Sequence, residues 1–215
     1  MLKVYGNQIS SPSNKVRYVA NYLNLDYDFE EVDLRGGAQR KPEYLAMNPA
    51  GKVPVIRDGE FTLFESNAII RYLARREKSD IYPDELKARA LTDQWMDFGS
   101  IHVGGAMSRI FWNKVIVHRI GQQPDESSLK TGESWLGNQL PILNTRLGQT
   151  AYLAGKTLTL ADFCLLATID PIDICQIDLK PYRALNEWRE KLKTQDFYQK
   201  CHKYYGEALM ENAQE

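Results

Sequence analysis

The stretch from Asn48 to Leu73 constrains the fold more than any other part of this chain. Two apolar runs, Val55-Ile56 and Phe61-Thr62-Leu63, flank the pair Asp58-Gly59, which is a strong signal for a hairpin turn. Beyond these runs, residues 66–73 repeat apolar side chains at helical spacing. The stretch therefore predicts a strand, a tight turn, a second strand and a helix, in that order.

The ends of these predicted elements carry groups suited to binding a peptide. Proline cannot donate to a strand ladder, so Pro54 is expected at the start of the first strand. If the Val53-Pro54 bond is cis, as X-Pro bonds permit, the N–H and C=O of Val53 face outward and can pair with an extended peptide. The start of the helix favours a carboxylate, and the Glu65 side chain suits an ammonium. A site for an amino-acid head group is thus expected beside a strand-like peptide site.

The rest of the chain completes a two-domain pattern. Strands are predicted at residues 2–5 and 27–32 and helices at 14–23 and 42–47, so that the order becomes β-α-β-α-β-β-α, a thioredoxin-like half ending near Lys78. A linker containing Pro83 follows, and the remainder shows only helical patterns. The predicted fold is an α/β thioredoxin-like domain, residues 1–78, followed by an all-α domain, residues 85–215.

Two local features are expected within the helical part. Pro141 interrupts a leucine pattern, and a proline inside a helix removes a hydrogen bond, so a kink or two separate helices are predicted there. The run Thr159-Leu160-Ala161-Asp162 has the form of a capping box at a helix start. The threonine caps the helix, and the acid three residues later bonds back to the threonine backbone. Both features are interpreted as structural.

These patterns together resemble the cytosolic glutathione transferases, in particular the serine-type theta and phi classes. The resemblance rests on the stretch described above and on YPDELKARALTDQW at 82–95 and LAGKTLTLADF at 153–163, and it covers essentially the whole chain. It implies the glutathione transferase fold. Its strongest motif is Val-Pro followed about a dozen residues later by Glu-Ser. That motif indicates fold more strongly than catalysis, because relatives without transferase activity keep the fold.

The resemblance implies a catalytic serine in the loop before the first helix. In the serine-type enzymes this residue lies six positions before a valine of the helix, and counting back from Val16 reaches Ser10, with Ser11 as the fallback. Its hydroxyl donates a hydrogen bond to the sulfur of glutathione and favours the thiolate. Read from the loop alone, Ser10, Ser11 and Ser13 would be turn and cap residues, as such a cluster usually is.

The resemblance also implies where glutathione binds. Glu65 and Ser66 would take the γ-glutamyl end, Val53 before Pro54 would pair with the cysteinyl backbone, and Lys52 would meet the glycyl carboxylate. For Lys52 the plain alternative is a solvated surface position.

The chain departs from the family at two places. Gln39 stands where relatives often have a histidine, so either its amide or the neighbouring Arg40 is expected to take over that contact; a solvated position is the alternative for both. Gly104 and Gly105 stand where theta-class relatives carry arginines, and they predict a break, close packing or open pocket space. Ser108 and Trp112 share a helical face with Gly105 and are the candidate electrophile-site residues, although an aromatic at helical spacing is commonly core.

Composition excludes several other classes of function. A net charge of −1 argues against a nucleic-acid partner, and four aspartates interrupt the apolar segment 161–179, which argues against a membrane span. The first residues enter a strand pattern directly and leave no room for a signal peptide. Cys164, Cys175 and Cys201 are odd in number and widely spaced, as expected of reduced thiols in the cytoplasm. The histidines form no metal-ligand spacing, so no metal is expected and glutathione is the only co-substrate implied.

The sequence therefore predicts a cytoplasmic, homodimeric glutathione transferase that adds the thiolate to a small hydrophobic electrophile. The alternatives left open are a glutathione-dependent dehalogenase or peroxidase, a non-catalytic scaffold or regulator on the same fold, and a thiol oxidoreductase. An oxidoreductase would want a cysteine near the first helix, and this loop has none.

Overall fold

The computed structural model describes residues 1–207 of the chain and divides into two compact units. The first unit contains Met1–Tyr82 and residues 195–207, and the second contains Pro83–Thr194. The sequence had assigned residues 85–215 to the second domain, so the two descriptions differ for the segment that begins at Gln195. No helix within residues 1–207 combines the length and the apolar character needed to cross a bilayer.

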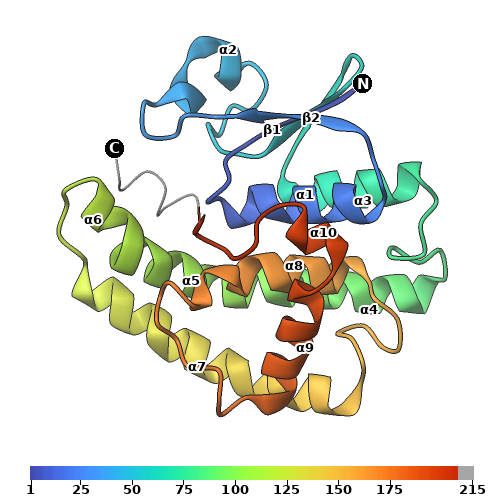
Figure 1. The fold of residues 1–215 in the computed structure, drawn as a ribbon, viewed down its shortest axis with the longest axis vertical. Coiled ribbons are helices and arrows are strands. Elements are labelled where there is room, and N and C mark those ends of the chain that lie inside the picture. Colours follow the sequence, from blue (N-terminus) through green and yellow to red (C-terminus); the bar gives the residue numbers. More distant parts are fainter. Residues whose placement is uncertain (208–215) are drawn as a thin grey trace. The chain divides into compact units, whose positions relative to one another are not determined.

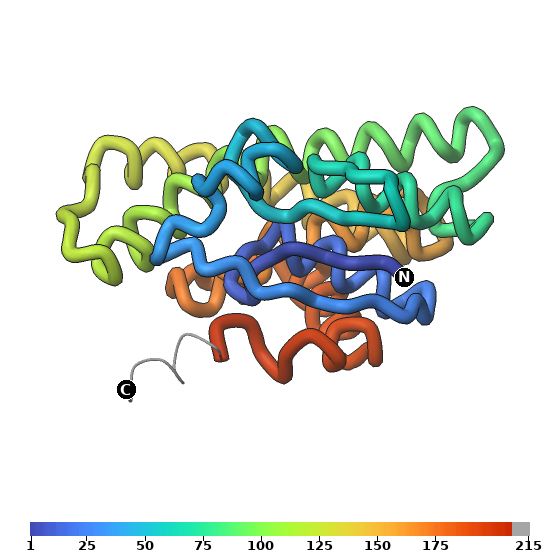
Figure 2. Tube along the Cα trace, turned by 90° about the horizontal axis from the view of Figure 1, so that it is seen from above, coloured from blue at the N-terminus to red at the C-terminus, as the bar shows by residue number. Residues whose placement is uncertain are grey.

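The first unit is built on a four-stranded sheet with the strand order β2-β1-β3-β4. Its strands are β1 (Leu2–Gly6), β2 (Tyr27–Glu31), β3 (Val55–Asp58) and β4 (Phe61–Phe64). The strand β1 pairs in parallel with β2 and antiparallel with β3 (Figure 2). The turn at Asp58-Gly59 joins β3 to β4, as predicted, and Gly59 has a positive φ of 59° that the turn requires.

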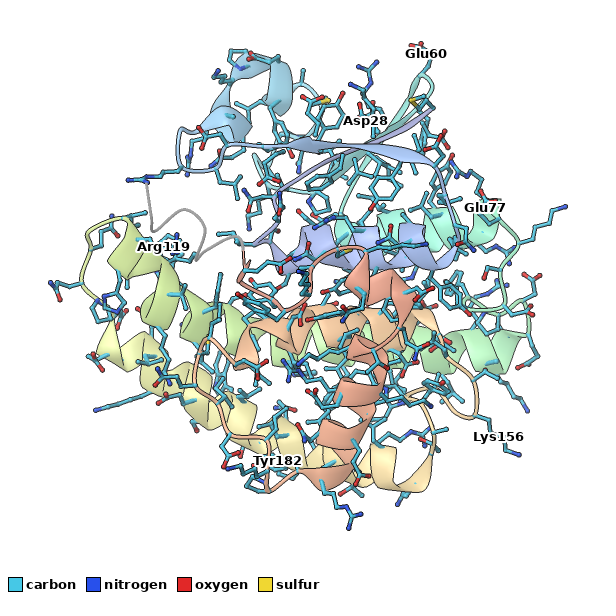
Figure 3. The ribbon with its side chains drawn as sticks, in the orientation of Figure 1. Asp28, Glu60, Glu77, Arg119, Lys156 and Tyr182 are labelled. Atoms are coloured by element: carbon cyan, nitrogen blue, oxygen red, sulfur yellow. The ribbon has the colours of Figure 1, made fainter. Side chains whose placement is uncertain are left out.

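Helices cover both faces of this sheet. The helices are α1 (Ser11–Tyr22), the short α2 (Pro42–Leu45) and α3 (Ser66–Arg76). The helices α1 and α3 lie side by side on one face, and α2 lies over the other (Figure 1). Tyr44 of α2 packs with the buried Tyr5, Val32 and Val55, which explains why the sheet is buried on both sides. The predicted order β-α-β-α-β-β-α is confirmed, and charged side chains such as Glu60 and Glu77 stay at the surface (Figure 3).

The segment after Gln195 belongs to the first unit because it packs on α1. It contains the short helix α10 (Asp196–Gln199). The rings of Tyr18 on α1 and Tyr198 stack with centroids 5.3 Å apart, and the Tyr18 hydroxyl lies 2.9 Å from Nε2 of His202. Arg17 donates from its guanidinium to the carbonyl oxygen of Cys201 at 3.1 Å. These residues are buried, so the segment supplies part of the core around α1.

The second unit is helical, as predicted. Its α-helices are α4 (Leu86–Asp97), α5 (Gly104–Phe111), α6 (Val117–Arg119), α7 (Glu126–Gln149), α8 (Leu160–Ile169) and α9 (Arg183–Lys193). Two π-helical stretches, Phe98–Val103 and Trp112–Ile116, flank α5. Of the two expectations at Pro141, two separate helices are wrong, because α7 continues through it, and the kink stays a prediction. Buried leucines before and after the proline keep one face of the helix packed, namely Leu136, Leu140, Leu143 and Leu147.

The start of α8 confirms the predicted capping box. The backbone N–H of Thr159 donates to Oδ2 of Asp162 at 2.9 Å. The other carboxylate oxygen accepts from the N–H of Leu153 at 2.9 Å and from Nε1 of Trp188 at 3.1 Å. Asp162 is fully buried, and burial raises the pKa of its carboxyl to about 6 against the effect of these donors. The acid therefore joins a helix start, a loop and α9 inside the second unit.

Candidate functional site

The pairing of three strands brings the predicted binding residues of the first unit to one end of the sheet. Tyr5 of β1 lies opposite Val55 of β3, which in turn lies opposite Phe64 of β4. The loop after β1 leads to Ser10, Val53 lies just before β3, and Glu65 follows β4 directly. Strand register, and not sequence spacing alone, thus makes one site out of three separate segments.

Ser10 is both the cap of α1 and a free hydrogen-bond donor. It is half-buried, and its Oγ accepts from the N–H of Ser13 at 3.4 Å. Within residues 1–207 its O–H has no acceptor. Ser11, the fallback, is the first residue of α1, is half-buried, and makes no side-chain hydrogen bond in the described part of the chain. The capping interpretation and the donor interpretation of Ser10 are therefore compatible, because capping uses only the oxygen as an acceptor.

The Ser10 loop is held by residues that the sequence analysis did not single out. Asn7 Oδ1 accepts from the N–H of Ile9 at 3.1 Å, and the amide of Asn14 donates to the carbonyl of Gln8 at 2.7 Å. Tyr205 donates from its hydroxyl to the carbonyl of Ile9 at 2.5 Å. The bond of Asn7 two residues along the chain is an Asx turn, which its position could have indicated. The contribution of Tyr205, far away in sequence, carried no such signal.

Val53 presents an unpaired backbone. The Val53-Pro54 peptide bond is cis, Pro54 is buried, and Val53 is half-buried. Within the described residues, neither the N–H nor the C=O of Val53 makes a hydrogen bond. Because buried backbone groups are nearly always paired, a free pair at an accessible position suits an incoming strand-like peptide.

Two residues fix the segment that leads into Val53. The carbonyl of Lys52 accepts from the Tyr44 hydroxyl at 3.0 Å and from the Asn48 amide at 2.7 Å. Burial raises the pKa of Tyr44 to about 12, so the hydroxyl remains a donor at any physiological pH. The Lys52 side chain is exposed, and within residues 1–207 its ammonium has no partner. Tyr44 and Asn48 hold the backbone, which leaves the Lys52 charge available.

Gln39 and Arg40 lie in a short 3-10 turn, Ala38–Arg40, and differ in availability. Gln39 is half-buried and donates from its amide to the carbonyl of Leu34 at 3.3 Å. Its Oε1 is buried and has no partner in the described part of the chain. Arg40 is exposed, and its guanidinium makes no ion pair among these residues. Gln39 is thus engaged within its loop, and Arg40 is the residue whose charge is available to replace the histidine that relatives often have here.

Glu65 and Ser66 form the start of α3. Glu65 has φ of 72° and ψ of 108°, a backbone conformation that costs a residue with a side chain on the order of 1–3 kcal/mol. It is exposed, and its carboxylate has no partner within residues 1–207. The Oγ of Ser66 accepts from the ammonium of Lys15 at 3.2 Å. Strained backbone, a free carboxylate and a helix start coincide here, as at many binding sites.

The candidate electrophile residues lie in the second unit. Ser108 on α5 is exposed, and Trp112, which follows α5, is 49% exposed. A Cβ added at Gly105 would meet no atom within 4 Å, whereas one at Gly104 would contact the carbonyl of Gly99 at 3.4 Å. Gly104 follows a π-helical stretch directly. The glycine pair therefore coincides with a change of helix type and with open space at Gly105.

No group of three or more potential metal ligands comes together within residues 1–207. The polar groups at the end of the sheet are instead donors, acceptors and single charges, of the kind that recognise an organic ligand.

Comparison with known proteins agrees with this organisation. The family model of the glutathione S-transferase N-terminal domain matches residues 1–75, and the family model of the C-terminal domain matches residues 102–196. Glutathione S-transferase F12 of Arabidopsis thaliana is 30% identical over 207 residues, which cover 93% of this chain and 96% of that protein.

Two solved structures are similar over nearly the whole chain. The theta class glutathione S-transferase from the citrus canker pathogen Xanthomonas axonopodis pv. citri, with glutathione bound, shares 30% identity at a TM-score of 0.86 and covers 93% of this chain and 95% of that one. Glutathione S-transferase I from maize, in complex with an atrazine glutathione conjugate, shares 26% identity at a TM-score of 0.85 with the same coverage of 93% and 95%.

Proposed function

Because this chain belongs to the glutathione S-transferase family, we propose that it is a glutathione transferase that binds glutathione on its first unit and transfers the thiolate to a small hydrophobic electrophile. Relatives of this chain are named as an F-type glutathione S-transferase of Arabidopsis thaliana and as a theta class enzyme with glutathione bound. The observation that carries the proposal is the free hydroxyl of Ser10 at the same end of the sheet as the unpaired backbone of Val53 and the free carboxylate of Glu65.

Ser10 stabilises the thiolate of bound glutathione. A free thiol has a pKa of about 8.5, and each unit by which that pKa falls corresponds to about 1.4 kcal/mol. A hydrogen bond from a hydroxyl to an anion contributes roughly 1.5–3 kcal/mol, and the positive end of α1 adds to it. The bound thiol should therefore have its pKa lowered by about one to two units, which makes the thiolate the main form near neutral pH.

The tripeptide is bound by the free backbone of Val53, the free carboxylate of Glu65 and Ser66, whose Oγ accepts from Lys15 while its O–H has no acceptor among the described residues. Val53 pairs with the cysteinyl backbone, Glu65 with the γ-glutamyl ammonium, and Ser66 with the γ-glutamyl carboxylate. The exposed cations Lys52 and Arg40 bind the glycyl carboxylate. The Gln39 amide already donates to the carbonyl of Leu34 within its own loop, which supports Arg40 as the residue that contacts the glycyl carboxylate.

The electrophile binds at the second unit against Trp112 and Ser108, whose exposure supports this assignment. The same thiolate chemistry would serve substitution, conjugate addition, dehalogenation or peroxide reduction, so the preferred reaction depends on this surface.

We further propose that the protein works as a homodimer in the cytoplasm. The exposed rings of Phe61 and Phe64 on the edge strand β4 support a partner surface on the first unit. The three cysteines, Cys164, Cys175 and Cys201, are buried and none of them forms a disulfide, which supports a reducing compartment.

The test is a pH titration of the ultraviolet thiolate absorbance of glutathione bound to the wild-type protein, to Ser10→Ala and to Ser11→Ala. We expect a thiol pKa about one to two units below its solution value in the wild type and a return toward that value in Ser10→Ala. A return in Ser11→Ala alone would move the role to Ser11. Binding without any lowering of the pKa, together with no conjugation of a chloronitroaromatic substrate, would leave a glutathione-binding scaffold and overturn the proposal.

A further inference from the structure

Lys15 is a buried cation directed at the start of α3. It lies in the middle of α1 and is only 5% exposed. Its ammonium donates to Oδ1 of Asn67 at 2.8 Å and to Oγ of Ser66 at 3.2 Å. Both acceptors belong to the first turn of α3, so α1 delivers a positive charge to the place where α3 begins.

The charge of Lys15 is not neutralised by the described protein. A lysine is almost never buried unless it is paired, because moving an unpaired ammonium out of water is costly. Within residues 1–207, however, no carboxylate lies within 4.0 Å of this ammonium, and both of its partners are neutral. The site therefore holds a positive charge without its counter-ion.

The geometry also directs the proton of Ser66. Its Oγ accepts from Lys15, so its own O–H cannot point toward the ammonium and has to point elsewhere. Within the described residues, neither this O–H nor the backbone N–H of Ser66 has an acceptor. The N–H groups at the first turn of a helix and the helix dipole also favour an anion at this position. Three independent contributions, a charge, a hydroxyl and a helix start, thus prefer the same kind of ligand.

We propose that Lys15 is a positioning residue for the α-carboxylate at the γ-glutamyl end of the substrate, acting through Ser66. Lys15 fixes the Ser66 hydroxyl as a donor, and its charge compensates the carboxylate, while Asn67 holds the ammonium from its other side. This inference rests on the proposed function, because it assumes that a γ-glutamyl peptide binds at Ser66. It adds a residue of α1 to that subsite and makes the subsite selective for a free α-carboxylate.

The test uses three peptides that differ only in the head group. Glutathione has both the α-ammonium and the α-carboxylate, 4-aminobutanoyl-Cys-Gly lacks the carboxylate, and glutaryl-Cys-Gly lacks the ammonium. Their dissociation constants are measured by calorimetry for the wild type and for Lys15→Met, which keeps an unbranched side chain one atom shorter and removes the charge. Glu65→Gln is the matched variant, because it removes the partner of the ammonium instead.

Lys15→Met should weaken binding of glutathione and of glutaryl-Cys-Gly about tenfold and leave binding of 4-aminobutanoyl-Cys-Gly unchanged. Glu65→Gln should weaken glutathione and 4-aminobutanoyl-Cys-Gly and leave glutaryl-Cys-Gly unchanged. Lys15→Arg should restore most of the affinity for the carboxylate ligands, since it retains the charge. In kinetic assays the loss should appear in the KM for glutathione and not in kcat.

An equal loss for all three peptides in Lys15→Met would show a packing role and overturn the inference, and so would no loss at all. If Lys15→Met does not fold, Lys15→Gln replaces it, because the glutamine amide is polar and uncharged; the same carboxylate-specific loss is expected. Failure of the wild type to bind any of the peptides would instead count against the proposed function.

Discussion

The free polar groups at the end of the sheet in the first unit contrast with a buried acid of the second unit. In the first unit, the hydroxyl of Ser10, the backbone of Val53 and the carboxylate of Glu65 have no partner within the described residues. In the second unit, the buried carboxylate of Asp162 accepts from the backbone N–H groups of Leu153 and Thr159 and from Trp188. Polar groups that a protein satisfies internally stabilise its fold, whereas accessible groups left free are available to a ligand.

This difference matches the two kinds of substrate that a transferase must bind. Glutathione is always the same molecule, so fixed donors and charges at the end of a sheet can recognise it. Electrophiles vary, and for them we propose the surface of the second unit that has the exposed ring of Trp112 and open space at Gly105. Changes in the second unit should therefore alter either stability or electrophile preference, and changes in the first should alter the use of glutathione.

The largest expected effect is on stability, from Asp162→Ala. The substitution leaves several buried donors without an acceptor, each at about 1–3 kcal/mol, and we expect a loss of about 3–5 kcal/mol in the free energy of unfolding. Urea denaturation followed by far-ultraviolet circular dichroism measures it. The exposed Asp178 accepts one hydrogen bond, from Lys180, and Asp178→Ala is the control, with an expected loss below about 1 kcal/mol. Equal losses in the two variants would remove the contrast between the units.

Much of this organisation could be predicted from local sequence. The turn at Asp58-Gly59 and the box between Thr159 and Asp162 follow from residues a few positions apart, and both occur as predicted. The burial of Lys15 could not, because it depends on Ser66, 51 positions away in the chain. Pro141 failed as a helix breaker because packing along α7 outweighs the loss of one hydrogen bond. Turns and helix caps can be predicted from residues close together in the sequence, whereas contacts between residues far apart in the chain cannot.

A smaller effect is expected from Trp112→Ala, which tests whether the second unit binds the electrophile and not glutathione. Removing an exposed ring from an apolar contact costs about 1–2 kcal/mol, so the KM for a hydrophobic electrophile should rise about five- to thirtyfold. The KM for glutathione should not change. Steady-state kinetics with each substrate varied in turn separates the two. Trp135 is also exposed, at 44%, and Trp135→Ala is the control. A rise in the glutathione KM would contradict the assignment of Trp112 to the electrophile.

The smallest effect is expected from Tyr205→Phe, which removes one hydroxyl from the segment packed on α1. Its hydrogen bond to the carbonyl of Ile9 restrains the residue next to Ser10, and a neutral hydrogen bond contributes about 0.5–1.5 kcal/mol. If that bond holds the Ser10 hydroxyl in place for the sulfur, its loss should raise the pKa of the bound thiol by a few tenths of a unit and lower kcat by no more than about threefold at neutral pH.

Tyr204→Phe is the matched control, because Tyr204 is the adjacent residue, is 50% exposed, and makes no side-chain hydrogen bond within residues 1–207. It should leave both the thiol pKa and kcat at their wild-type values. If Tyr205→Phe lowered the melting temperature without moving the thiol pKa, the bond would serve only the fold of the first unit. A shift of the thiol pKa in Tyr205→Phe alone would mean that a residue far along the chain helps to set the chemistry of the first loop, because thiolate stabilisation depends on where the Ser10 hydroxyl is held.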